Sequence, residues 1–417
     1  MPTTFTYHGT AARRDAAGRQ ARCAFMTMKS INTERNILKT LLASILFAMT
    51  SCSLLSSKEL VKLPATANSL DSLQAQAVYD RAQYFPNGTQ LSICIIKGDS
   101  EKYCGIERRN DSLVYVDNSD SVFEIGSITK TFTGTMLAKL VYDGKVNQDD
   151  PVKNYLPVTL NQSSLNGKEM TLVQLANHTS GLPFEPTDVK NDSKSPYDQW
   201  APYKNYSMER LYDYLSHQLV LQSTPGEKRI YSNLGGGLLG HILTLITKKS
   251  YEELMFETIC KPLGMSNTFV ELTPDRERRM VHGRYPLGGL LPFDGGDCGA
   301  LTGCGGVKSS AKDLVKYLRA NMTDTTYFYL AQKPTKQFDE HFSGALGWAP
   351  YSERGKVHQG AFGATPGYTC GIMFERNTRV GVVVLTNVSA YLSTKGNGAE
   401  GLCRALYDPL PFADEQK

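Results

Sequence analysis

The chain has 417 residues, of which 41% are hydrophobic and 21% are charged, and its formal net charge is +4. This length exceeds what one hydrophobic core usually serves, so two domains or one large composite domain are expected. The composition is that of a folded soluble protein. A charge this small, with no basic stripe interleaved with aromatic residues, excludes nucleic acid as an expected partner.

The N-terminal region has the pattern of an export signal. Basic residues precede a short apolar run at 41–49, and small residues and Cys52 follow it. This order is typical of a secretory signal, and the run is too short to span a bilayer stably. A cysteine directly after the small residues resembles a bacterial lipoprotein signal, in which Cys52 is acylated and becomes the new N-terminus. Simple cleavage and an uncleaved anchor are the alternatives.

These features predict how the chain is divided. Met26 or Met28 is the expected start, so residues 1–27 are not part of the mature protein. Residues 28–52 are the lipoprotein-type signal peptide, and 53–70 form a polar tether. Residues 71–412 form the folded domain. We therefore expect an exported protein that is anchored to a membrane on the periplasmic side.

Hydrophobic periodicity predicts one sheet that is built from both ends of the chain. The predicted strands cover 91–96, 370–374 and 379–386, and the predicted helices cover 127–144, 211–221, 234–248, 310–318 and 398–407. Few strand signals occur between about 145 and 295. The fold class expected is α/β (α+β), with an antiparallel sheet flanked by helices and an inserted, mainly helical region at about 145–295.

An exported protein can form disulfides. The part after Cys52 has an odd number of cysteines, so they cannot all pair internally. Cys94 with Cys104, across a predicted hairpin, and Cys298 with Cys304, across a Gly-rich loop, are the candidate pairs. No Cys-x-x-Cys or His-Glu-x-x-His spacing occurs, so no metal site is predicted.

Ser127-Ile128-Thr129-Lys130 is the first stretch that suggests chemistry. Residues three apart share a helix face, so Lys130 can reach the Ser127 hydroxyl, which needs a neighbouring base or cation to become a nucleophile. The helix N-terminus also favours developing negative charge. The same spacing recurs at Ser309 to Lys312, where Ser310 and Asp313 predict a helix cap instead.

Two further patterns supply partners for Ser127. In Tyr231-Ser232-Asn233, the tyrosine can act as a general base if nearby cations lower its pKa. Asn233 can bind a substrate carbonyl or orient Lys130. His358-Gln359-Gly360 precedes Ala361 and a Gly-rich stretch, where a backbone can approach a ligand closely. The Tyr-x-Asn spacing alone is weak, because Tyr203-Lys204-Asn205 repeats it.

In this order the motifs resemble the serine β-lactamase and penicillin-binding protein superfamily, and specifically its class C branch with the related DD-peptidases and esterases. The resemblance covers about residues 75–410. Four further stretches are similar to the family: 140–152, the "HTSGLP" segment within 171–183, 261–265, and 305–310. The implied fold is β-lactamase/transpeptidase-like.

The resemblance implies acyl transfer by Ser127, with Lys130 and Tyr231 sharing the proton. Asn233, His358, Gly360 and Ala361 are the implied substrate-binding and oxyanion residues, with the backbone N–H groups of Ser127 and Ala361 forming the oxyanion hole. No metal or organic cofactor is implied. His178, in the "HTSGLP" segment, is expected to be structural.

The third motif departs from the family pattern, because His358 stands where class C β-lactamases have lysine. A titrating imidazole and a permanent ammonium differ as anion anchors. The expected function is therefore a penicillin-binding, DD-carboxypeptidase/endopeptidase-like hydrolase acting on peptidoglycan peptides. A class C β-lactamase acting on β-lactams, an esterase, and a non-enzymatic penicillin-recognising sensor are the alternatives.

Overall fold

The computed structural model describes residues 70–189, 203–284, 289–290, 298–389 and 398–408. All of them belong to one compact unit that begins at Leu60. The predicted signal peptide, Cys52 and the tether up to residue 69 lie outside the described residues. Within these ranges, no helix is long and apolar enough to cross a membrane.

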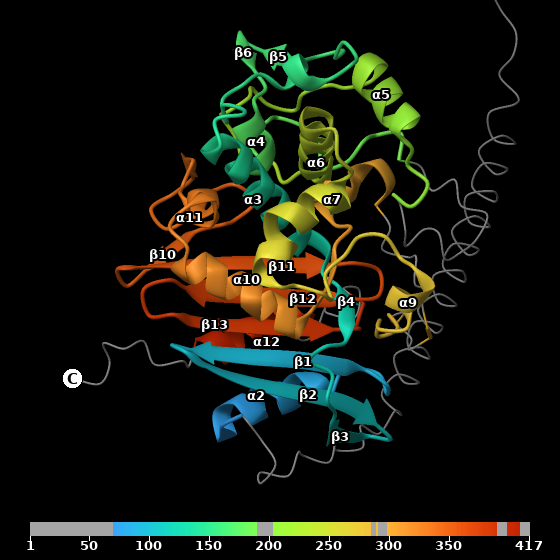
Figure 1. Ribbon diagram of the computed structural model, residues 1–417, viewed down its shortest axis with the longest axis vertical. Coiled ribbons are helices and arrows are strands. Elements are labelled where there is room, and N and C mark those ends of the chain that lie inside the picture. The colour runs from blue at the N-terminus through green and yellow to red at the C-terminus, as the bar shows by residue number, and fades with distance from the viewer. Residues whose placement is uncertain (1–69, 190–202, 285–288, 291–297, 390–397, 409–417) are drawn as a thin grey trace, which may run out of the picture. The chain divides into compact units, whose positions relative to one another are not determined.

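The main sheet joins the two ends of the chain, as the sequence predicts. It has seven strands in the order β10-β11-β12-β13-β1-β2-β3. Their bounds are Tyr351–Glu353, Lys356–Ala364, Thr369–Glu375, Val380–Thr386, Gln90–Lys97, Ser100–Arg109 and Ser112–Tyr115. All neighbouring strands are antiparallel. The N-terminal strand β1 pairs with the C-terminal strand β13, with Ile93 opposite Val384 (Figure 1).

Helices cover both faces of this sheet. On one face, α2 (Ser72–Ala82) and α12 (Gly398–Tyr407) pack on alternate residues of β1 and β13, such as Ile93 and Val384. The intervening residues, such as Cys94 and Val383, face the opposite core, where α10 (Ala311–Thr323) contacts the same two strands. Because both faces of β13 are buried, its sequence is an uninterrupted apolar run and does not alternate between apolar and polar residues.

The remaining helices form the predicted insertion and its surroundings. The main ones are α3 (Thr129–Tyr142), α4 (Leu172–Ala176), α5 (Met208–His217), α6 (Asn233–Thr247), α7 (Tyr251–Met255), α8 (Lys261–Leu263), α9 (Pro274–Glu277) and α11 (Tyr327–Gln332). Short two-stranded pieces join them: β4 (Val122–Glu124) with β7 (Lys308–Ser310), β5 (Ser164–Leu165) with β6 (Lys168–Glu169), and β8 (Lys336–Gln337) with β9 (Ser343–Gly344). The region is mainly helical, as expected.

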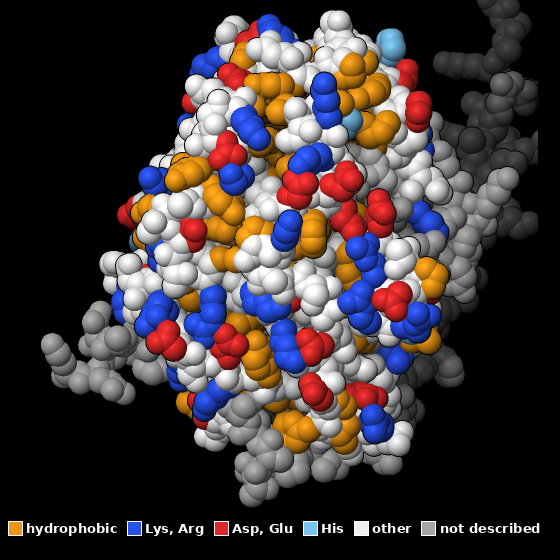
Figure 2. All heavy atoms as spheres, viewed as in Figure 1, with side chains coloured by type: hydrophobic (Ala, Val, Ile, Leu, Met, Phe, Trp, Pro, Cys, Tyr) orange, Lys and Arg blue, Asp and Glu red, His pale blue; other side chains and the backbone are white. Residues whose placement is uncertain are grey.

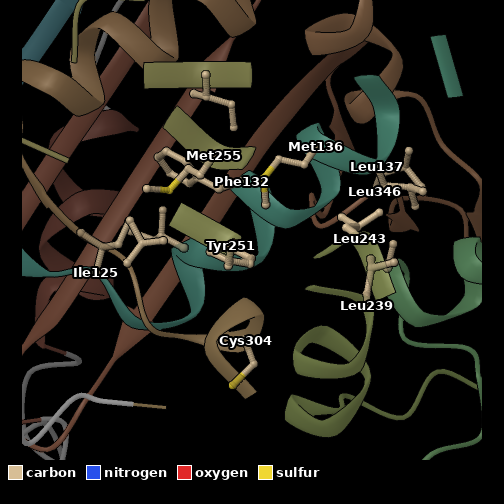
Figure 3. Close-up of a cluster of buried hydrophobic side chains, with 14 of the residues drawn as sticks. Ile125, Phe132, Met136, Leu137, Leu239, Leu243, Tyr251, Met255, Cys304 and Leu346 are labelled. Atoms are coloured by element: carbon tan, nitrogen blue, oxygen red, sulfur yellow. The ribbon is translucent and has the colours of Figure 1, made fainter. Parts of the chain in front are cut away.

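Helix α3 runs through the middle of the core. Phe132 and Met136 are fully buried, and they lie among Leu239 of α6, Met255 of α7 and Leu346 (Figure 3). A helix that is apolar or small on every side is buried throughout. The hydroxyls of Thr131, Thr133 and Thr135 on α3 donate to backbone carbonyls, so these three buried donors are paired. The start of α3 is therefore held rigidly.

The surface in Figure 2 has acidic and basic side chains interspersed over the whole visible face. Ion pairs between distant segments of the chain include Arg319 with Glu101 and Lys312 with Asp120. Exposed pairs of this kind contribute little stability each.

The cysteines behave differently from the sequence expectation. Cys94 lies opposite Tyr103, and Cys104 lies opposite Ile93, so the two thiols point to opposite faces of the sheet. The candidate pair Cys94–Cys104 is therefore wrong. Cys298 and Cys304 do meet, but as thiols that share a hydrogen bond and not as a disulfide.

Candidate active site

Ser127 lies on a tight turn that precedes α3. The 3₁₀ turn η2 covers Gly126–Ile128, and Gly126 has a φ of +49°, where a Cβ would lie 2.7 Å from the Ala364 nitrogen. Strand β11 therefore passes directly beside the turn. Gly363 of β11 is equally constrained, since a Cβ there would lie 1.8 Å from the Ile125 carbonyl oxygen and 3.1 Å from the Ser127 nitrogen.

Lys130 lies one turn further along and is only 5% exposed. Its Nζ donates to Ser127 Oγ at 3.0 Å, to Asn233 Oδ1 at 2.8 Å and to the Cys304 carbonyl at 2.7 Å. An ammonium has three donors, so all are used. Burial lowers the pKa of Lys130, but the Tyr231 phenol and the Cys304 thiol outweigh it, and the pKa is raised. Lys130 is thus a cation at neutral pH.

Tyr231 approaches Ser127 from the other side. Its hydroxyl donates to Ser127 Oγ at 2.7 Å, and the Lys130 ammonium lies 4.9 Å from its ring centroid. The ring lies against the imidazole of His178, with centroids 4.4 Å apart. One serine oxygen therefore contacts both an ammonium and a phenol.

Asn233 begins α6, and Ser232 caps that helix by accepting from the Gly235 N–H at 2.8 Å. The amide of Asn233 is fixed at both ends: Oδ1 accepts from Lys130, and Nδ2 donates to the Tyr203 hydroxyl at 3.1 Å. Tyr203 in turn donates to Glu185 at 2.6 Å. Asn233 is expected either to bind a substrate carbonyl or to orient Lys130. These hydrogen bonds fit the second role. The sequence had no local signal for the Tyr203–Glu185 extension.

His358, Gly360 and Ala361 lie on β11, and all three line the same cavity as Ser127, Lys130 and Tyr231. The cavity has a volume of about 1040 Å³. The His358 imidazole is 8% exposed, and its Nδ1 lies 2.8 Å from the Tyr407 hydroxyl of α12. Burial lowers its pKa, although Glu375 acts in the opposite direction. Burial therefore favours the neutral form of the His358 imidazole.

His178 is held in the left-handed region with a φ of +64°. Its Nδ1 accepts from the Ser232 N–H at 3.2 Å, and its carbonyl accepts from the Ile230 N–H at 2.8 Å. Burial, followed by the charges of Lys130 and Arg229, holds its pKa well below 6.5. His178 therefore acts as a neutral imidazole that holds the segment around Tyr231 in place.

His178→Asn should reduce the loss of stability in acid. Below about pH 6.5 the unfolded chain binds a proton that folded His178 does not, so stability falls as pH falls towards the folded pKa. Asparagine tolerates a positive φ and offers an acceptor, but it does not titrate. Thermal unfolding from about pH 7.5 to pH 5 should show a shallower decline of Tm. His217→Asn, at an exposed helix position, is the control, and equal slopes for all three proteins would refute the role.

The other conspicuous residues have packing roles. His241 Nε2 lies 2.7 Å from the Tyr212 hydroxyl, and Trp348 is 2% exposed and stacks on Tyr317. The second Ser-x-x-Lys match, Ser309 to Lys312, does not form a site of this kind. Ser310 caps α10, as predicted, and Lys312 pairs with Asp120. Within the described ranges, no three His, Cys, Asp or Glu side chains converge as a metal site would require.

Fold and site together define a serine hydrolase, with a Ser-x-x-Lys helix beside an antiparallel sheet. The chain belongs to the β-lactamase family, whose model matches residues 100–398. It is 29% identical over 287 residues to the D-alanyl-D-alanine-carboxypeptidase/endopeptidase AmpH of Escherichia coli K12, covering 68% of this chain and 70% of that protein. It is 28% identical over 239 residues to a β-lactamase of Pseudomonas fluorescens, covering 56% and 59%.

Solved structures show the same fold. A β-lactamase/D-alanine carboxypeptidase from Yersinia pestis, complexed with citrate, superposes with a TM-score of 0.66 at 23% identity, over 81% of this chain and 98% of that one. A class C β-lactamase from Rhodobacter sphaeroides gives a TM-score of 0.64 at 24% identity, over 81% and 98%. The predicted fold class and family are thereby confirmed.

Proposed function

We propose that this protein is a DD-carboxypeptidase/endopeptidase-like hydrolase that acts through an acyl-enzyme on amide bonds of cell-wall peptides or related D-amino-acid substrates. The observation that carries the proposal is the convergence of Lys130 Nζ and Tyr231 OH on Ser127 Oγ, at 3.0 Å and 2.7 Å. The similarity to AmpH, over more than two thirds of both chains, supports this substrate class.

In the proposed reaction, Tyr231 reacts as its phenolate. Ser127 Oγ attacks the scissile carbonyl carbon and its proton passes to the Tyr231 oxygen, which lies 2.7 Å away. The Lys130 ammonium donates to Ser127 Oγ at 3.0 Å and so stabilises negative charge that develops on that oxygen as its proton leaves. The backbone N–H groups of Ser127 and Ala361 stabilise the oxyanion, and one such donor is worth about 3–4 kcal/mol in the transition state. Tyr231 then delivers the proton to the leaving amine, as general acid. Water attacks the resulting ester and releases the acyl group.

The third motif favours a peptidase over an efficient β-lactamase. Burial lowers the pKa of His358 and so favours its neutral form, and the Gln359 Nε2 donates to the Gln332 carbonyl at 3.4 Å. Neither supplies the permanent cation that the class C pattern has at this point. A penicillin-recognising sensor would retain its adduct and cleave no peptide.

A substrate panel separates these functions. The purified protein is incubated with a labelled penicillin, a chromogenic cephalosporin, a short-chain p-nitrophenyl ester and muropeptides. We expect muropeptide cleavage together with persistent penicillin labelling. Fast cephalosporin turnover would instead indicate a β-lactamase, ester turnover alone an esterase, and labelling with no turnover a sensor.

We further propose that residues 28–52 are a lipoprotein signal and that 53–70 tether the 71–412 domain to a periplasmic membrane surface through acylated Cys52. The apolar run and the small residues before Cys52 support this. Cys52→Ser should release the protein from the membrane fraction into the soluble fraction. It should also abolish labelling by a radioactive fatty acid. Retention of both label and membrane fraction would refute the anchor.

A further inference from the structure

Arg229 is a cavity-lining cation that the proposed reaction does not use. It precedes Tyr231 by two residues and lines the same cavity as Ser127. Its guanidinium carbon lies 5.1 Å from the ring centroid of Phe342 and 5.8 Å from that of Phe338. Planar guanidinium groups stack on aromatic faces in this way. The two rings therefore hold the planar guanidinium group in place, while its N–H donors remain available for a ligand.

No described carboxylate pairs with Arg229. Burial lowers its pKa and the Tyr231 phenol raises it, and no Asp or Glu contributes. The other cations of the site differ in this respect. Lys130 has all three donors engaged, and Arg404 pairs with Glu400 at 3.1 Å. Arg229 is thus the cation beside Tyr231 with donors left for a ligand.

The remaining cavity cations are too far from the reacting carbonyl. Arg354 and Lys356 lie at the turn between β10 and β11. Ala361 is five residues beyond Lys356 along β11, which corresponds to about 16 Å of extended strand. Charges at that distance meet distal parts of a long substrate and not the group next to the scissile bond.

The chemistry of the leaving group gives Arg229 a ligand. Tyr231 must reach the leaving amine nitrogen to protonate it. When the leaving group is a C-terminal amino acid, its carboxylate carbon lies about 2.5 Å from that nitrogen, across Cα. The carboxylate therefore lies on the Tyr231 side of the site. A guanidinium binds a carboxylate through two parallel N–H···O bonds.

We propose that Arg229 binds the free α-carboxylate of the residue that leaves during acylation, and so selects peptides with an unblocked C-terminal residue next to the scissile amide. This inference rests on the proposed peptidase function and makes it a carboxypeptidase rather than an endopeptidase. Arg229 takes over the anion-anchoring role that a lysine at position 358 would have supplied.

The test compares two substrates in several variants. Steady-state kinetics are measured on a peptide that ends in D-alanyl-D-alanine and on the same peptide with a C-terminal amide. Arg229→Gln should raise KM for the free acid by about 10- to 100-fold, with kcat changed only slightly and the amide unaffected. Arg229→Lys should restore part of the preference. Lys228→Gln removes the adjacent cation, which is exposed as Arg229 is but does not line the cavity, and should behave as wild type.

Three outcomes would overturn the inference. The first is an Arg229→Gln protein that keeps the wild-type preference for the free acid over the amide. The second is an equal loss of activity on both peptides in this variant. The third is a wild-type protein that cleaves the amide as well as it cleaves the free acid. If the wild type cleaves neither peptide, the proposed function fails separately. The acylation rates of Ser127 by benzylpenicillin and by its methyl ester then provide the same comparison, and an equal effect of Arg229→Gln on both rates would overturn the role.

Discussion

Ser127→Ala is expected to lower kcat for every hydrolysed substrate by at least about 10⁴-fold. The substitution removes the oxygen on which Lys130 and Tyr231 converge, so no acyl-enzyme can form. KM should change little, because the cavity walls remain. The measurement is kcat on the best substrate of the panel, with Tm recorded to show that the fold is intact.

The chain offers a matched control for this variant. Ser309 also begins a Ser-x-x-Lys match, but it lies on β7 and its hydroxyl contacts Thr268 at 2.8 Å. Ser309→Ala removes a buried hydrogen bond worth about 1 kcal/mol and should leave kcat unchanged. A Ser127→Ala protein that retains wild-type turnover would show that another residue is the nucleophile.

Tyr231→Phe should give the second largest loss, about 10²- to 10⁴-fold in kcat. Phenylalanine keeps the ring against His178 and removes only the hydroxyl that donates to Ser127 at 2.7 Å. Lys130 is an ammonium and has no lone pair with which to accept the proton instead. Rapid-mixing kinetics should show that acylation itself becomes slow.

Tyr206→Phe is the control for Tyr231→Phe. Tyr206 is buried, its hydroxyl donates to Asp188 at 2.9 Å, and it does not line the cavity. The two variants should therefore lose similar stability and differ sharply in acylation rate. If both keep the wild-type acylation rate, Tyr231 is not the proton carrier.

The parts of the fold that the sequence predicts well are those with strong local signals. The continuous apolar run of β13 and the helical spacing of α3 each determine their element. The Ser310 cap also distinguishes the second Ser-x-x-Lys match from the first, because its side chain accepts from the Asp313 N–H at 3.3 Å. In these cases the periodicity and the cap agree with the tertiary contacts.

The elements that were missed depend on distant contacts. Strand β11 has a Gly-rich sequence with little apolar alternation, and its path is fixed by the close approach of Gly363 to Ile125. The Tyr203–Glu185 pair reaches Asn233 from another segment of the chain. Sequence spacing does not encode such contacts, so the support of Lys130 became visible only in three dimensions.

For His358, the sequence predicts the position of the side chain but not its charge state. The motif itself predicts an imidazole beside the site, and His358 does line the cavity. Its hydrogen bond to Tyr407 and its lowered pKa come from the packing of α12 on the sheet. The charge state of a side chain depends on burial, and burial here is a property of the assembled fold.

The central claim is a covalent acyl-enzyme on Ser127, and trapping it tests that claim most directly. The purified protein is incubated with benzylpenicillin, and the intact protein and its proteolytic peptides are then analysed by mass spectrometry. We predict a gain of one penicilloyl group, located on Ser127 and missing in Ser127→Ala. A protein that hydrolyses substrate with no adduct on Ser127, or with the adduct on another residue, would contradict the account.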